Sequence, residues 1–519
     1  MIAAEDSKWW TLGAVCLGTF MLLLDITIVN VALPSIQTDL GSTFADLQWV
    51  VDAYALTLAA LLLTGGALAD MYGRRKLYTI GLVVFVLASV LCGSAQSPLM
   101  LEISRGLQGV GGAIMFAVSL ALLAQAFRGP ERGVAFGIWG AVTGIAVAIG
   151  PLLGGTLVSG LSWRWIFFVN LPIGIGALVL TSLRVAESRD NNSRRPDWPG
   201  FVLFTAALAL LVYGLIESGR IGFTDPKVLT CFAVSAALIA AFLVAERVSR
   251  QPMFDLALFR LPTFAGGAVA AFGISASIFS MFLYLTIYLQ DVLGYSAFDT
   301  GLRLIVASGA IFVVAAPAGR LTSKVPIRAL IGPGLVLVGG GLLWMRGLDA
   351  DSSWTHLVPG LILSGVGVGF INPPLASTAV GVVQPQRAGM ASGINSTFRQ
   401  IGIATGIALL GTLFSNRLRD AVASAVHANP VGFSAAQITG ALENGHAEDL
   451  FKQASAGGGS PQRLATLQHI ARGSFTTALD HILLVGAVIA IVCGVLAFVL
   501  IRQRDFVQHG AMEDSPAIG

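Results

Sequence analysis

Fourteen apolar stretches, each long enough to cross a membrane, dominate the sequence. The hydrocarbon core of a bilayer is about 30 Å thick, and a helix needs about 20 residues to cross it. Only 11% of the residues are charged, whereas a soluble domain has about 25%. The sequence therefore predicts an all-α polytopic membrane protein with fourteen transmembrane helices. The predicted spans are 9–33, 47–69, 77–95, 99–126, 133–158, 165–184, 199–217, 228–246, 263–290, 300–320, 328–347, 355–380, 389–414 and 477–501.

The distribution of lysine and arginine predicts the orientation of these spans. An even number of spans puts both termini on one side of the membrane. Basic residues gather in the connections on the N-terminal side, for example at 74–76 and 194–195, whereas the short connections on the other side hold few. Because cytoplasmic loops carry this excess, we predict a multi-pass protein of a bacterial cytoplasmic membrane with both termini in the cytoplasm.

Two polar segments and a faint internal repeat divide the chain. GALADMYGRR at 66–75 aligns with GRLTSKVPIR at 319–328, 253 residues further on, and such repeats are common in transporters. The predicted parts are an N-terminal six-helix bundle (1–184), a cytoplasmic linker (185–198), two inserted transmembrane helices (199–247), a C-terminal six-helix bundle (263–501) and a cytoplasmic tail (502–519).

The C-terminal bundle includes a long outer loop at 415–476, the largest hydrophilic insert in the chain. Ser434 and Ser460, which precedes a proline, have the features of helix N-caps. This pattern predicts short helices within the loop. A disordered loop explains the same composition equally well, and we keep both interpretations.

Asp25 lies inside the apolar stretch LLLDITIVNVALPSI at 22–36. A carboxylate at membrane depth is costly unless it is paired, protonated or facing water. Counting residues from the predicted helix ends places Asp25 and Arg105 at about the same depth, with Asp52 slightly shallower. The group is either a static ion pair that holds helices together or a proton site, because burial and a neighbouring cation change the proton affinity of a carboxylate in opposite directions.

Other polar side chains also fall within predicted spans. Arg399 lies about ten residues from the inner end of the thirteenth span, with Asn395 one turn away, and it suits a structural role or a substrate contact equally well. Tyr284 and Tyr288 share one face of the ninth span, where they serve in packing, as interface anchors or as substrate contacts.

Several function classes are excluded by what the sequence lacks. No P-loop, HExxH, GxSxG or dinucleotide-binding pattern is present, so we predict no enzyme, no ATP binding and no cofactor. A net charge of +3 is too small to indicate nucleic acid. The cysteines stand alone in apolar spans, which is typical of small buried side chains and not of metal ligands or disulfides; they are Cys16, Cys92, Cys231 and Cys493.

Four motifs follow one another along the chain: LDITIVNVALP (24–34), GALADMYGRRKLY (66–78), LEISRGLQGVGGA (101–113) and GIAVAIGPLLGG (144–155). In this order they resemble the motifs of the major facilitator superfamily. The stretch at 24–34 is also similar to the helix 1 motif of its fourteen-helix drug:proton antiporters of the EmrB/QacA type, and WRWIFFVNLPIG at 163–174 and YLQDVLGYS at 288–296 resemble the same group. Met71 and Tyr78 depart from the motif between helices 2 and 3.

The resemblance implies the major facilitator fold, with two six-helix bundles and two inserted helices, and it implies roles for individual residues. The proton-coupling residues would be Asp25, Asp52 and Arg105. The residues that control conformation would be Gly66, Asp70, Gly73, Arg74, Arg75, Gly150, Pro151, Gly154 and Gly155. We further assign to a substrate cavity Asn30, Gln108, Tyr284, Tyr288, Asn395 and Arg399.

The residues give independent support for the conformational set. Asp70 and Arg74 are spaced for pairing at i, i+4, although the arginines also suit a simple cytoplasmic anchor. Glycines such as Gly150 and Gly154 let helices approach closely, and Pro151 can kink a helix. Tight packing alone explains the glycines as well.

These features predict a proton-coupled antiporter that exports small hydrophobic or cationic drugs by alternating access, working as a monomer. The alternatives are a dedicated exporter of one metabolite, antibiotic or lipid, and a nutrient symporter, against which the antiporter-like motif of helix 5 argues. A sensor that does not transport is a further alternative, but no added tail domain supports it.

Overall fold

The chain is a bundle of long helices in the computed structural model, which describes residues 4–42, 44–189, 197–249, 256–384, 387–428, 431–443, 447–456 and 461–506. Within these residues no strand occurs. In this described part of the chain, twelve helices are long and apolar enough to cross a membrane, and the bent α5 (Gly129–Gly160) adds a thirteenth. α13 (Arg328–Trp344) is apolar but shorter than these helices, and counting it gives the predicted number of fourteen. The predicted all-α multi-pass fold is confirmed.

The N-terminal bundle contains six spans, and its core surrounds the buried Tyr78, Phe85 and Trp139. Its sixth span is broken into a short and a longer helix. The helices are α1 (Ala4–Leu40), α2 (Phe44–Tyr72), α3 (Arg74–Gly93), α4 (Pro98–Ala126), α5 (Gly129–Gly160), α6 (Trp165–Phe168) and α7 (Asn170–Arg184).

The C-terminal bundle also contains six spans, and the first of them includes two π-helical segments. Its helices are α10 (Pro262–Ile274), η2 (Ser275–Phe279), α11 (Ser280–Ile287), η3 (Tyr288–Val292), α12 (Ala297–Leu321), α13 (Arg328–Trp344), α14 (Val358–Gly381), α15 (Ala388–Ala428) and α18 (Pro461–Leu500). The 3₁₀ turns η1 (Leu256–Arg260), η4 (Trp354–Leu357) and η6 (Gln503–Asp505) join or follow these spans.

The two inserted spans, α8 (Trp198–Ile221) and α9 (Pro226–Val248), form a hairpin beside the bundles. α8 packs against both α2 and α15, whereas the most apolar stretch of α9 is only 22% buried. The side chains of Asp197 and Asp225 accept backbone N–H groups at the two helix starts. Of the predicted linker, residues 190–196 lie outside the described residues, as does the tail beyond 506.

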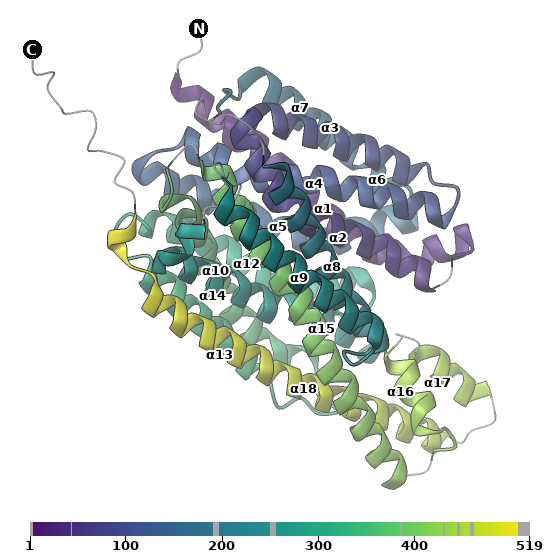
Figure 1. Cartoon of the computed structure of the whole chain (residues 1–519). Helices are drawn as coiled ribbons and strands as arrows, with labels where there is room; N and C mark the ends of the chain where they lie inside the picture. Colours follow the sequence, from purple (N-terminus) through teal and green to yellow (C-terminus); the bar gives the residue numbers. More distant parts are fainter. Residues whose placement is uncertain are drawn as a thin grey trace, which may run out of the picture.

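The two bundles meet through two related helix pairs, α5 with α12 and α2 with α15. Each pair joins the second span of one bundle to the fifth span of the other, which is the arrangement expected of a repeat related by a pseudo-two-fold axis. The start of α1 and the turn η6 lie at the same end of the molecule (Figure 1). We call this the termini end and the other the distal end.

The segment 415–476 is more regular than a loop. α15 continues to residue 428 and α18 begins at residue 461, so two spans extend well beyond their predicted ends, and α16 (Ala435–Glu443) and α17 (Ala447–Ala456) lie between them. Figure 1 shows this extension projecting from the distal end. Leu418, Ile438 and Leu467 are buried in a cluster continuous with the core of the C-terminal bundle. Ser460 lies outside the described residues.

The predicted N-cap at Ser434 is confirmed. Its hydroxyl accepts the Gln437 N–H at 3.3 Å, and its own N–H donates to the Gln437 Oε1 at 2.9 Å. The two residues therefore form a capping box, in which each satisfies a backbone or side-chain group of the other.

Replacing Ser434 with alanine should destabilise α16 by about 1 kcal/mol, because the Gln437 N–H loses its acceptor. Hydrogen exchange of the α16 amides should become about fivefold faster. Ser424→Ala is the control, since Ser424 is an exposed residue within α15 whose hydroxyl only donates to the Asp420 carbonyl. Unchanged protection of α16 in Ser434→Ala would contradict the cap.

Candidate functional site

Asp25 is fully buried in the middle of the N-terminal bundle. Its Oδ2 accepts a hydrogen bond from Arg105 Nη1 at 2.5 Å. Its Oδ1 accepts from Gln108 Nε2 at 2.8 Å and from Asn170 Nδ2 at 2.9 Å. The carboxylate therefore has one cationic and two amide donors, and the predicted meeting of Asp25 and Arg105 is observed.

Arg105 is held in place by more than its ion pair. Its Nε donates to the Val50 carbonyl at 3.0 Å, and its Nη1 also donates to Gln108 Oε1 at 2.7 Å. The guanidinium carbon lies 4.3 Å from the centre of the Tyr54 ring, a cation–π distance. Both Val50 and Tyr54 come from α2, so the cation of α4 is fixed by α1 and α2 together.

Gln108 and Asn170 extend the cluster to α3 and α7. Gln108 Nε2 donates to Ser89 Oγ at 2.8 Å, and Ser89 in turn donates to the Phe85 carbonyl. Gln108, assigned to a substrate cavity from the sequence, is thus buried beside the ion pair. Ser89 and Asn170 were not predicted. The only sequence signal for Asn170 is its place in the family-like stretch at 163–174.

The other residues assigned to proton coupling or to the cavity lie in several places. Asp52 is a partly exposed residue of α2, and Asn30 is exposed on α1. Tyr284 is buried in the C-terminal bundle, where its hydroxyl donates to the Ile407 carbonyl at 3.0 Å. Tyr288 is also buried there and stacks on Phe475. This arrangement supports the packing interpretation for both tyrosines.

Arg399 connects two helices of the C-terminal bundle. Its Nη2 donates to Asn372 Oδ1 at 3.1 Å, which links α15 to α14, while its buried Nε has no hydrogen-bond partner. Asn395, one turn before it, is buried. Asn372 packs close to Gly140 of α5, so Arg399 lies near the place where the two bundles meet.

Asp70 binds across the bundle interface at the termini end. Its Oδ1 accepts from Arg74 Nε at 2.8 Å and from the Gly389 N–H at 3.0 Å, and its Oδ2 accepts from the Met390 N–H at 2.8 Å. α15 begins at Ala388, so these are N–H groups of its first turn, which lack partners within the helix. A carboxylate is favoured there by the helix dipole.

At the termini end the two bundles also approach each other closely at two glycines. A Cβ atom at Gly66 would overlap the Gly389 carbonyl, and a Cβ atom at Gly319 would overlap the Gly133 carbonyl. Gly66 and Gly319 are the repeat-related positions found in the sequence. The two bundles therefore touch backbone to backbone at two pseudo-symmetric points of the termini end.

Gly73 and the linker hold the start of α3. Gly73 has a φ of 112°, which favours glycine. Both oxygens of Glu187 accept N–H groups of the first turn of α3, from Arg75 and from Lys76, each at 3.0 Å. The Arg75 side chain donates to the Val185 carbonyl. The role of Glu187 was not predicted, because the linker sequence indicates only a polar connection between two spans.

The glycines of α5 face two neighbours. Cβ atoms at Gly150 and Gly154 would crowd Thr27 and Ile28 of α1, whereas Gly155 has more space beside Phe298 of α12. The axis of α5 bends by 41° between 131–147 and 152–160. The side chain of Pro151 lies outside the described residues.

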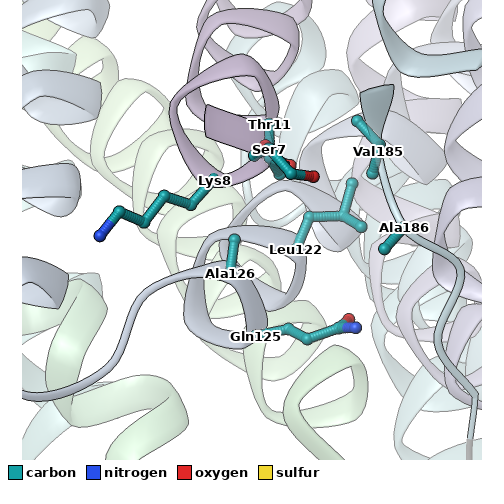
Figure 2. A pocket seen from close by; sticks show the side chains of 8 residues that line it. All are labelled: Ser7, Lys8, Thr11, Leu122, Gln125, Ala126, Val185 and Ala186. Atoms are coloured by element: carbon teal, nitrogen blue, oxygen red, sulfur yellow. The ribbon is translucent and has the colours of Figure 1, made fainter. Parts of the chain in front are cut away.

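A cavity of about 150 Å³ lies at the termini end (Figure 2). Ligand pockets are usually 300–1,000 Å³, so it is too small for a drug-sized molecule. Lys8 points away from the other lining side chains (Figure 2) and pairs with Glu131 at 2.8 Å. In the described part of the chain no three His, Cys, Asp or Glu residues could hold a metal ion. The lining residues are Ser7, Lys8, Thr11, Leu122, Gln125, Ala126, Val185 and Ala186.

Two related six-helix bundles with a buried charge cluster in one of them are the architecture of a helical membrane transporter. The family model of the Major Facilitator Superfamily matches residues 15–407, and the chain belongs to this family. The structure of the proton:xylose symporter XylE has the same fold, with a TM-score of 0.61 at 11% identity over 96% of each chain.

Two curated bacterial relatives are much closer in sequence. The multidrug resistance protein Stp of Mycobacterium tuberculosis is 41% identical over 406 residues, covering 78% of this chain and 75% of Stp. The puromycin resistance protein pur8 of Streptomyces alboniger is 37% identical over 419 residues, covering 79% of this chain and 82% of pur8. The chain is thus similar to proteins of drug and antibiotic resistance.

Removing one partner of the buried ion pair should be strongly destabilising. Arg105→Met leaves the Asp25 carboxylate without a counter-charge, which should lower the free energy of unfolding by about 3–5 kcal/mol. The double variant Asp25→Asn with Arg105→Met should recover part of this loss, because no buried charge remains. Unfolding by denaturant in detergent measures each value.

The matched control is the pair of Arg164 and Asp39, 2.6 Å apart and 33% and 46% exposed. Arg164→Met should cost less than about 1 kcal/mol, because water screens an exposed pair. Equal losses in the free energy of unfolding for Arg105→Met and Arg164→Met would show that burial does not increase the contribution of the Asp25–Arg105 pair to stability.

Proposed function

We propose that this chain is a proton-coupled antiporter that exports small hydrophobic or cationic drug-like compounds. It would work as a monomer in a bacterial cytoplasmic membrane, with both termini in the cytoplasm and without ATP. The main support is the buried ion pair of Asp25 and Arg105, which places a carboxylate beside a guanidinium inside one bundle. The similarity to Stp and pur8 supports drug or antibiotic export.

A proton arriving at Asp25 would cancel its charge and leave Arg105 with only neutral partners. The interaction that joins α1 to α4 would weaken, so the two protonation states would favour different helix arrangements. One proton crossing about 100 mV contributes about 2.3 kcal/mol, in addition to the pH gradient. One or two protons per cycle therefore suffice to concentrate a drug outside the cell.

Alternating access would move the bundle of 1–184 against the bundle of 263–501, with 199–247 inserted beside them. The distribution of basic residues supports a cytoplasmic termini end. The Asp70 contacts to Gly389 and Met390 then close the cytoplasmic side. In other states Asn30, Asn395 and Arg399 would face the substrate path between the bundles.

A dedicated exporter of one antibiotic is the second candidate. The observation that favours it is the similarity to pur8, whose name refers to resistance to puromycin alone. A panel of lipophilic cations, neutral antibiotics and lysolipids separates the two candidates. Proton release driven by many compounds supports a multidrug exporter, and release driven by a single compound supports a dedicated one.

Asp25→Asn should abolish substrate-driven proton movement in liposomes that contain a pH-sensitive dye, because the amide that replaces the carboxylate cannot take up a proton. We expect a loss of at least about tenfold. The variant should be less stable but still folded, because Arg105 keeps the Val50 carbonyl, Gln108 Oε1 and the Tyr54 ring as partners. Asp39→Asn, on the same helix but in an exposed pair with Arg164, should retain the flux. Proton-coupled export that persists in Asp25→Asn would refute the assignment.

Asp70→Asn should open the cytoplasmic side, because the charged hydrogen bonds to the first turn of α15 become neutral ones. Such bonds are worth about 1.5–3 kcal/mol, so the ratio of the closed to the open state should fall about tenfold or more. Spin labels at the exposed positions 76 and 324, one on each bundle, measure the opening as a longer distance.

The control for Asp70 is Ser323→Ala. Ser323 occupies the repeat-related position, but its hydroxyl donates only to the Arg320 carbonyl in its own bundle. Its removal should leave the distance distribution unchanged. If both variants shift the distribution equally, the opening does not depend on the Asp70 carboxylate.

A further inference from the structure

Asn170 has one unused polar atom inside the charge cluster. Its side chain is fully buried. The Nδ2 group donates to Asp25 Oδ1 at 2.9 Å and to Ser89 Oγ at 3.4 Å, whereas the carbonyl oxygen Oδ1 has no hydrogen-bond partner. A buried polar atom without a partner costs about 1–3 kcal/mol, so the described arrangement leaves Asn170 incompletely satisfied.

Gln108 is the second amide on Asp25, and it is fully engaged at both ends. Its Oε1 accepts from Arg105 Nη1 at 2.7 Å and from Cys92 Sγ at 3.7 Å. Its Nε2 donates to Asp25 and to Ser89. Turning this amide around would point its N–H groups at the Arg105 guanidinium, so Gln108 is locked as a donor.

The difference between the two amides becomes important when Asp25 takes up a proton. An ionised carboxylate only accepts hydrogen bonds, whereas a protonated carboxyl must donate one. Oδ2 faces the Arg105 guanidinium, and Oδ1 faces the two amide N–H groups. A proton on either oxygen therefore points at a donor unless one neighbour offers an acceptor instead.

We propose that Asn170 is a positioning residue that turns its amide by half a rotation about Cβ–Cγ when Asp25 is protonated. The inference rests on the proposed proton coupling through Asp25. In the protonated state Asp25 Oδ1–H donates to Asn170 Oδ1, while Oδ2 still accepts from Arg105. The turn gives up only the two bonds of Asn170 Nδ2, of which the one to Ser89 is long at 3.4 Å.

The remaining groups around Asp25 cannot take this role. The titratable and charged groups that face it are Arg105 from α4, Cys92 from α3 and Tyr54 from α2. Arg105 has no acceptor atom, and Cys92 already donates to Gln108. Ser89 donates to the Phe85 carbonyl and accepts from Gln108. The Tyr54 hydroxyl also has no partner, but it makes no hydrogen bond to Asp25 and lies beside Gly112. Asn170, from α7, is already hydrogen-bonded to Asp25 Oδ1 and carries an unoccupied acceptor on the same amide.

Infrared difference spectra between low and high pH test the proposal on the full chain in liposomes. The band of the protonated carboxyl is assigned to Asp25 by its loss in Asp25→Asn. In Asn170→Leu this band should move to a higher wavenumber, because the carboxyl no longer donates a hydrogen bond. The pH at which the band appears should move as well.

Thr181→Val is the matched control for this measurement. Thr181 is buried on the same helix, and its replacement also removes a polar group without changing the size of the side chain. It should change neither the wavenumber nor the midpoint of the Asp25 band. A band in Asn170→Leu identical to that of the unmodified chain would overturn the role of Asn170.

A measurement on the unmodified chain keeps the test valid if Asn170→Leu does not fold. With asparagine labelled by ¹³C at the side-chain carbonyl, one amide band should move to a lower wavenumber on protonation, as Asn170 Oδ1 gains a hydrogen bond. Absence of this movement, with the Asp25 band present, refutes only the rotation of Asn170. Absence of any Asp25 band refutes the proton coupling itself, and the inference with it.

Discussion

The N-terminal bundle is organised by the need to bury one negative and one positive charge away from both water and lipid. Such charges are tolerated only when the charged groups themselves find hydrogen-bond partners within the protein. Asp25 and Arg105 meet this condition through groups of five helices, α1, α2, α3, α4 and α7. Apolar packing in a membrane has little orientational preference, so this cluster fixes how these helices are rotated about their axes.

The interface between the bundles has a different physical basis. Backbone contacts at Gly66 and Gly319 are related by the repeat, and they make the two sides of the termini end similar in shape. The charges are not similar. On one side the Asp70 carboxylate of α2 accepts N–H groups from the first turn of α15. On the other side Ser323 forms a hydrogen bond only within its own bundle. The shape complementarity is thus shared by both halves, whereas the electrostatic attachment belongs to one.

Much of the architecture could be predicted, because membrane spans depend on length and apolarity, which are local. The meeting of Asp25 and Arg105 followed from depth alone. The partners Asn170 and Ser89 could not be predicted, because they depend on helix rotations that only the packed bundle sets. For the same reason the sequence assigned Gln108 to a substrate cavity, whereas the structure buries it beside the ion pair.

The sequence left short helices and a disordered loop equally open for 415–476, and it did not predict that α15 and α18 continue into this segment. These continuations carry polar outer faces and bury only a narrow apolar stripe. Leu418 and Leu467 become core residues only when α15 and α18 pack side by side beyond the membrane spans. Glu187 was missed for a related reason. The backbone groups it caps belong to α3, more than one hundred residues earlier in the chain.

α2 connects the charge cluster with the interface at the termini end. Near its start it supplies the Val50 carbonyl and the Tyr54 ring to Arg105, and near its end it carries Gly66 and Asp70. Asp70 lies twenty residues beyond Val50, which is about 30 Å along a helix. A helix resists bending over this length far more than it resists tilting as a unit. A displacement of Arg105 that moved the Val50 end of α2 would therefore tilt the helix and change the Asp70 contacts with α15, so that one element carries the state of the buried charges to the place where the bundles separate.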